Sequence, residues 1–142
     1  FFTGFSRFSS DIQKTTQKDM ADKERQLLEM LSLVDEAEKV LTTKTDLNEF
    51  GRLLDYTWKL KRGISSGISN SIDGLYAKGI EAGALGGKLL GAGGGGFLLF
   101  YVEEDKREAV AKAMEDLLYV PFQFENSGTR VIHYTAEMYE KR

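Results

Sequence analysis

The sequence contains no cysteine and only one histidine among its 142 residues. The absence of cysteine excludes disulfide bridges and thiolate metal sites. It also fits a reducing compartment, so we expect a cytoplasmic protein. His133 is the only possible imidazole ligand or base. Because no nucleophile or carboxylate motif accompanies it, we interpret His133 as an ordinary strand residue.

Long apolar runs and an excess of positive charge are also lacking. The longest purely apolar run, residues 97–102, is far shorter than the roughly 20 residues that span a bilayer. No signal peptide pattern opens the chain. Nineteen Lys and Arg stand against 22 Asp and Glu, for a net charge of −3. A nucleic-acid-binding domain is normally strongly basic. We therefore expect neither a membrane nor a nucleic acid as partner.

The length fits one ordinary globular domain, which would bury roughly 68% of its unfolded surface. The chain begins without methionine, on an apolar run at residues 1–5 that has the character of a strand. We interpret the chain as a piece of a longer protein that continues upstream of its first residue.

The first half of the sequence has the periodicity of helices. Three are predicted, at residues 19–40, 46–63 and 70–83. Asp46, with Glu49 three residues later, has the spacing of an N-terminal cap for the second helix. The first helix carries two neighbouring apolar stripes, and we expect both to be buried. Their members are Leu27, Leu31 and Val34 in one stripe and Met30, Leu33, Ala37 and Val40 in the other.

The second half changes to a period typical of strands. Strands are predicted at residues 87–90, 97–102, 120–124 and 129–134, with a helix at 105–118 and a turn at 125–128. Pro121 cannot donate to a ladder, so its strand is expected at an edge or a bulge. With the opening strand, the order predicts an α+β fold. We expect a two-layer sandwich of helices on an antiparallel sheet, of the ferredoxin-like kind.

Glycine is concentrated in one short segment. Twelve of the fifteen glycines lie between Gly63 and Gly96, and five of the six residues at 91–96 are glycine. Each glycine held in a fixed conformation costs about 0.5–1 kcal/mol relative to alanine. A tight strand connection needs only one or two of them. Bare amides can form a concave nest for phosphate oxygens, and hydrogen bonds to a charged acceptor contribute about 1.5–3 kcal/mol each. The segment therefore favours a phosphate-contacting loop.

Other interpretations of the loop fit less well. Gly91, Gly93 and Gly96 formally match the dinucleotide fingerprint G-x-G-x-x-G, but that fingerprint requires a helix directly afterwards, and here a strand follows. The Walker phosphate loop fails because no Gly-Lys-Ser or Gly-Lys-Thr follows at the right spacing. A glycine-rich hairpin that only lets two elements pack closely remains the alternative.

Two segments carry a resemblance to a known family. Residues 83–97, GALGGKLLGAGGGGF, resemble the third signature motif of the GHMP kinases, a superfamily that includes galactokinase, homoserine kinase, mevalonate kinase and phosphomevalonate kinase. Residues 68–76, ISNSIDGLY, are similar to the segment that precedes this motif. Residues 58–61 and the end of the glycine motif look most like the sugar kinases that phosphorylate D-glycero-D-manno-heptose 7-phosphate. The resemblance covers nearly the whole chain.

The resemblance implies a two-domain kinase that uses ATP and Mg²⁺, with residues 1–142 as its C-terminal domain. The main ATP loop and the catalytic Asp belong to the N-terminal domain, which would be the partner of this chain, so no catalytic residue is expected here. Most groups that bind the metal are expected there as well, and the chain alone is expected to be inactive. The acceptor would be a sugar phosphate. A fucose-, mevalonate- or homoserine-type kinase, or a non-catalytic ferredoxin-like binding module, stays open as an alternative.

The candidate site residues fall into two groups. A nucleotide site is expected at the loop, where Lys88 could reach a phosphate, although a lysine of a strand can equally face solvent. A substrate site is expected at Arg7, as a clamp for the acceptor phosphate, and at Asp73 and Ser69 as sugar contacts. A surface arginine, a helix cap and a turn residue are the plainer interpretations of these three. The residues of the nucleotide site are Gly91, Ala92, Gly93, Gly94, Gly95, Gly96 and Lys88.

Overall fold

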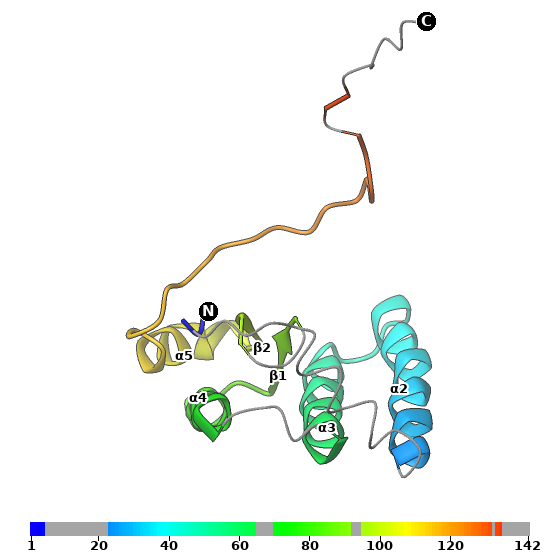
Figure 1. The fold of residues 1–142 in the computed structure, drawn as a ribbon, viewed down its shortest axis with the longest axis horizontal. Helices are drawn as coiled ribbons and strands as arrows, with labels where there is room; N and C mark the ends of the chain where they lie inside the picture. The colour runs from blue at the N-terminus through cyan, green and yellow to red at the C-terminus, as the bar shows by residue number, and fades with distance from the viewer. Residues whose placement is uncertain (5–22, 65–69, 92–94, 132, 135–142) are drawn as a thin grey trace, which may run out of the picture.

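The structure is a computed structural model. It describes residues 1–4, 23–64, 70–91, 95–131, 133 and 134. Helices and a small antiparallel sheet follow one another in the order predicted for an α+β fold (Figure 1). The elements are α2 (Glu24–Thr42), α3 (Asn48–Ile64), α4 (Asn70–Glu81), β1 (Gly86–Leu90), β2 (Phe97–Tyr101), the 3-10 turn η2 (Glu104–Lys106) and α5 (Arg107–Ala113). Each described helix is too short or too polar to cross a lipid bilayer.

Helix α2 packs against α3 at one side of the molecule (Figure 1). Its buried residues, Leu33 and Val40, belong to one of the two predicted stripes. The prediction that both stripes are buried is wrong, because Leu31 is 65% and Val34 61% exposed. Among the described elements α2 packs mainly against α3, and a helix packed on one side buries one stripe, so Leu31 and Val34 are exposed.

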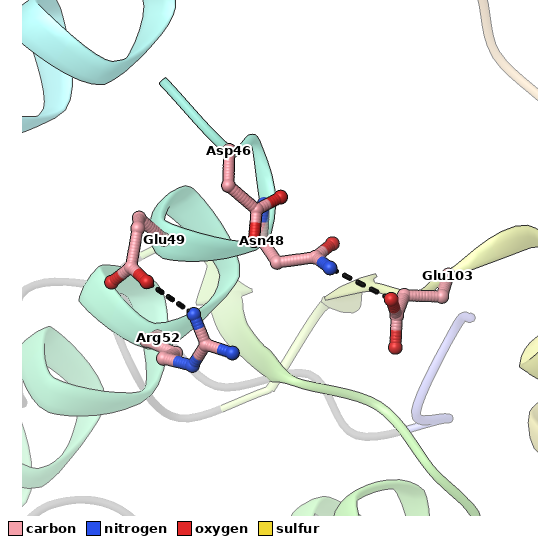
Figure 2. A network of polar contacts seen from close by, with 5 residues as sticks. All are labelled: Asp46, Asn48, Glu49, Arg52 and Glu103. Atoms are coloured by element: carbon pink, nitrogen blue, oxygen red, sulfur yellow. Dashed lines mark hydrogen bonds and ion pairs between the residues drawn. The ribbon is translucent and has the colours of Figure 1, made fainter.

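Helix α3 begins as its sequence predicts. The Asp46 carboxylate accepts a hydrogen bond from the Asn48 N–H at 3.0 Å, which satisfies one of the free amides of the first turn. Glu49 does not complete the expected capping box; it pairs with Arg52 along the helix surface (Figure 2). The Asn48 side-chain amide donates to Glu103 at 2.7 Å, so the start of α3 is tied to the segment that follows β2.

The sheet consists of β1 and β2, paired antiparallel with Gly86 opposite Tyr101 and Leu90 opposite Phe97. Two isolated β-bridges extend the pairing beyond β1 and β2. Phe2 bridges to Phe97 on one side and to Leu118 on the other. The opening residues, which the sequence predicts as a strand, thus lie between β2 and Leu118, a residue that follows α5.

The core lies between the sheet and helices α3 and α4. Trp58 of α3, Tyr76 of α4 and Leu89 of β1 are all less than 10% exposed and belong to one cluster. The rings of Trp58 and Tyr76 stack with centroids 4.9 Å apart. Trp58 is a core residue. The other members of the cluster are Ile72 and Leu98.

The predicted helix at 105–118 is shorter in the structure. It starts as η2 and ends as α5 at Ala113, and a turn follows in which the Leu117 N–H donates to the Met114 carbonyl at 2.9 Å. The Leu118 carbonyl accepts the Phe2 N–H at 2.9 Å. This bridge to the opening residues takes the place of a further helical turn.

The prediction of strands at 120–124 and 129–134 is wrong for the residues that the structure describes there. The chain is extended, but it has no ladder partner and leads away from the rest of the molecule (Figure 1). Phe124 is 92% exposed. The turn between them is present, with the Ser127 N–H donating to Glu125 at 3.3 Å and Gly128 at φ +63°. An alternating pattern makes a strand only when a sheet edge receives it.

Candidate functional site at the glycine loop

The glycine segment connects β1 to β2 as the loop of a hairpin. Leu90 and Phe97 form the last pair of the ladder. Gly91 and Gly96 are the first and last residues of the loop that this pair closes. Both have φ in the left-handed region, +104° and +111°. A Cβ on Gly96 would lie 2.8 Å from the Leu90 carbonyl oxygen. Closure of the hairpin therefore requires glycine at both ends of the loop, without reference to any ligand.

The opening residues hold the end of the loop in place. The Thr3 N–H and the Thr3 hydroxyl both donate to the Gly96 carbonyl, at 2.8 and 2.9 Å. The Phe1 carbonyl accepts the Leu98 N–H at 2.8 Å, one step further along β2. Thr3 is only 5% exposed, so these bonds are shielded from water. The sequence analysis missed Thr3, because a single threonine after two phenylalanines carries no recognisable signal.

The start of β1 is fixed by a hydrogen-bond chain from two helices. The Tyr76 hydroxyl accepts the Gly87 N–H at 3.1 Å and donates to Asp55 Oδ1 at 3.0 Å. Asp55 also pairs with Lys59 at 2.6 Å. Burial, with the nearby Asp55 carboxylate, raises the pKa of Tyr76 far above its ordinary value, so the hydroxyl stays protonated. These contacts orient the strand that leads to the loop.

Lys88 lies on β1 two residues before the end of the strand and is exposed. Another lysine, Lys61 of α3, lies close enough to interact with its charge. Burial, and then the charge of Lys88, lowers the pKa of Lys61. Nothing in the sequence alone assigns a role to Lys61.

The predicted substrate residues are separated in the structure. Asp73, in the first turn of α4, forms an ion pair with Arg62 of α3, and both side chains are partly buried. This ion pair joins two helices. It does not test the sugar contact predicted for Asp73, which stays a prediction. Arg7 and Ser69 lie outside the described residues, as do Ala92, Gly93 and Gly94 of the loop.

No group of three or more acidic or histidine side chains that could hold a metal ion occurs in the described part of the chain. The described residues therefore do not fit a Mg²⁺ site of their own. Lys88, exposed on β1, is the one predicted nucleotide contact with a charged side chain.

The fold and this loop define the class of protein: an α+β domain with a glycine hairpin at its sheet. The family model described as "GHMP kinases C terminal" matches residues 33–120. The chain belongs to this family, as the motif at residues 83–97 indicates, and its members are ATP-dependent kinases that generally use Mg²⁺.

Two known proteins are similar over most of the chain. A D-glycero-alpha-D-manno-heptose 7-phosphate kinase of Campylobacter jejuni is 30% identical over 135 residues, which is 92% of this chain and 40% of that kinase. The crystal structure of L. major mevalonate kinase in complex with R-mevalonate matches with a TM-score of 0.67 at 24% identity, over 81% of this chain and 36% of that one. The second likeness is one of fold. This chain spans well under half of either relative.

Proposed function

We propose that this chain is the C-terminal part of an ATP-dependent kinase whose acceptor is D-glycero-D-manno-heptose 7-phosphate. The observation that carries the proposal is the family match together with 30% identity to a heptose 7-phosphate kinase along nearly the whole chain. The phosphoryl group would pass from ATP to an alcohol of the sugar. ATP and a sugar phosphate are metabolites of the cytoplasm, which is the location we propose.

The glycine loop is proposed to contact the nucleotide phosphates or to brace the loop that does. Phosphoryl transfer depends mainly on positioning and on stabilising charge that develops on oxygen. Backbone amides of residues 91–96 would supply donors without side chains in the way, and Lys88 would add a positive charge. Thr3 supports this role because it holds Gly96 at the base of the loop, and Tyr76 holds the opposite end of β1 at Gly87.

The catalytic Asp and the Mg²⁺ ligands are proposed to belong to the remainder of the kinase. Mg²⁺ would bridge and neutralise the phosphate oxygens of ATP. Within this chain, Arg7, Asp73 and Ser69 are the proposed contacts to the acceptor. Asp73 would act from its ion pair with Arg62, which fixes the carboxylate at the start of α4.

A substrate panel on the full-length kinase tests the proposal. Purified enzyme is supplied with Mg-ATP and, separately, with heptose 7-phosphate, fucose, mevalonate and homoserine, and ADP release is followed. Turnover with heptose 7-phosphate well above the other three supports the proposal. Preference for another acceptor would assign the chain to a different GHMP kinase. If ATP were consumed with none of them and were not bound, the non-catalytic module would be the better account.

A further inference from the structure

We propose that the sheet has an open strand position, between residues 99–101 of β2 on one side and residues 120–122 on the other. The occupant that fits it is the segment of the full-length kinase that directly precedes Phe1. The inference rests on the proposed function, in which this chain is the C-terminal part of a longer kinase. The position itself follows from the register of the opening residues.

The opening residues form the end of this strand on the side of β2. The Phe1 nitrogen donates to the Leu98 carbonyl and the Leu98 N–H donates to the Phe1 carbonyl, both at 2.8 Å. Two residues further along, the Thr3 N–H donates to the Gly96 carbonyl at 2.8 Å. This spacing is that of an antiparallel ladder, in which one step back from Phe1 is one step along β2. The second residue before Phe1 would therefore lie opposite Phe100.

The other side of the opening residues carries a second register. Phe2 and Leu118 form an antiparallel bridge, in which the Phe2 N–H donates to the Leu118 carbonyl at 2.9 Å. The ring centroids of Phe1 and Tyr119 are 5.4 Å apart, as expected for side chains that face each other across two strands. One and three residues before Phe1, the same strand would lie opposite Val120 and Phe122.

The two sets of hydrogen bonds alternate in the way of a central strand. Phe1 and Thr3 bond to β2, whereas Phe2, between them, bonds to Leu118. Successive residues of a central strand turn their backbone groups to opposite neighbours, and an edge strand has a neighbour on one side only. Residues 1–3 thus have the bonding pattern of a central strand, and that pattern, continued upstream, fills the open strand position.

Pro121 fits this register. The Leu118 backbone faces Phe2, so the backbone groups of residues 120 and 122 would face the open strand position. Those of residue 121 would face away from it. Pro121 has no N–H, and its missing donor falls on the outer side, where no bond to the occupant is lost. A register shifted by one residue would turn the proline toward the occupant.

The faces of the sheet define the chemistry of the occupant. The ring of Phe1 lies 6.4 Å from that of Phe100, which packs 5.7 Å from Tyr76 of α4. The second residue before Phe1 shares this face and should be apolar. On the opposite face, Val120 and Phe122 are 40% and 62% exposed and would flank the first and third residues before Phe1. The occupant is therefore an extended segment with apolar side chains on both faces.

The occupant would continue directly into the residues that hold the glycine loop. Its last residue is followed by Phe1 and Phe2, and then by Thr3, whose N–H and hydroxyl both donate to the Gly96 carbonyl. A strand seated upstream would therefore fix Thr3, and through it the end of the loop. The open strand position thus connects the remainder of the kinase to its proposed phosphate loop.

Hydrogen exchange in the full-length kinase, measured by NMR, tests the inference. The amides of Val120 and Phe122 should exchange about 100-fold or more slowly than in the 142-residue chain. Exchange at the same rate in both proteins would overturn the proposal. Protection that rises with protein concentration would assign the position to a second copy and would overturn the proposed occupant.

A pair of variants of the full-length kinase tests the register. Phe122→Pro removes an N–H that should bond to the occupant, so the exchange of the Val120 amide should accelerate at least tenfold. Pro121→Ala is the matched control, because the N–H that it adds would face away, and it should leave the exchange of Val120 unchanged. Unchanged exchange in Phe122→Pro, or equal acceleration in both variants, would contradict the register.

The outcome is independent of turnover. A full-length protein that protects Val120 and Phe122 but phosphorylates none of the acceptors would contradict the proposed function and not the open strand position. An active heptose 7-phosphate kinase in which both amides exchange rapidly would contradict this inference alone.

Discussion

The Tyr76 hydroxyl accepts the backbone N–H of Gly87 at 3.1 Å. One side chain of α4 thereby takes up a backbone donor of β1, just before Lys88 and the glycine loop. The same hydroxyl donates to Asp55 of α3, so a single oxygen holds both helices to the strand. The position of β1 thus depends on a buried polar contact as well as on apolar packing.

Tyr76→Phe should destabilise the fold. It removes the acceptor for the Gly87 N–H and the donor to Asp55, and leaves a buried amide without a partner. The expected loss is about 1–3 kcal/mol in the free energy of unfolding, measured by urea denaturation. Tyr56→Phe is the control, because Tyr56 is exposed on α3 and its removal should have little effect. Equal stability of the two variants would show that the Tyr76 contacts contribute nothing.

The raised pKa of Tyr76 predicts how stability depends on pH. In the unfolded chain tyrosine ionises near pH 10, whereas the folded state keeps the proton to higher pH. The unfolded state therefore loses the proton first, and the contribution of Tyr76 to stability, complete below pH 10, should fall as the pH rises above it. The difference in unfolding free energy between wild type and Tyr76→Phe should shrink as the pH rises above about 10. A constant difference would contradict the assignment.

Gly96→Ala should destabilise the hairpin. The residue has φ +111°, and its Cβ would press against the Leu90 carbonyl oxygen. A cost of about 1–3 kcal/mol is expected for a non-glycine residue in this conformation, measured by thermal and urea unfolding. Gly74→Ala is the matched control, since nothing lies within 4 Å of a Cβ there and alanine favours a helix. It should leave stability unchanged or raise it. A neutral Gly96→Ala would mean that the loop closes differently.

Hydrogen exchange should separate the sheet from the extended segment. The Leu98 N–H donates to the Phe1 carbonyl and the Gly87 N–H to the buried Tyr76 hydroxyl, so both amides should exchange slowly. Residues 120–131 have no ladder partner and should exchange at nearly the rate of an unfolded peptide. Protection of alternate amides in this range, measured by NMR on the 142-residue chain, would restore the two strands that the sequence predicts.

Much of the helical half could be predicted from the sequence because its signals are local. The cap at Asp46 and the helical period of residues 46–63 depend on neighbours within a few turns, and both are confirmed. Which stripe of α2 is buried depends on how many elements pack against it, and the sequence does not state that number. The end of α5 likewise depends on Phe2, more than 100 residues away, which takes the Leu118 carbonyl.

The candidate site likewise contains residues that the sequence indicates and residues that only the structure reveals. Clustered glycines and a family motif point to the loop, and Lys88 precedes it closely in sequence. Thr3 bonds to Gly96 at the end of the loop and Tyr76 to Gly87 at the start of β1, and only the tertiary packing brings these residues together. The ion pair between Arg62 and Asp73 was missed for that reason: eleven residues separate them, and two helix faces must meet before they touch.

The central claim is that the loop at 91–96 serves phosphoryl transfer, and the most direct measurement is the turnover of full-length Gly94→Val with Mg-ATP and heptose 7-phosphate. A side chain at this position would occupy the space of a phosphate or push the amides away. We predict a loss of about 100-fold or more in kcat/KM, with an unchanged melting temperature, and normal turnover in the control Gly74→Val. Wild-type turnover in Gly94→Val would contradict the account.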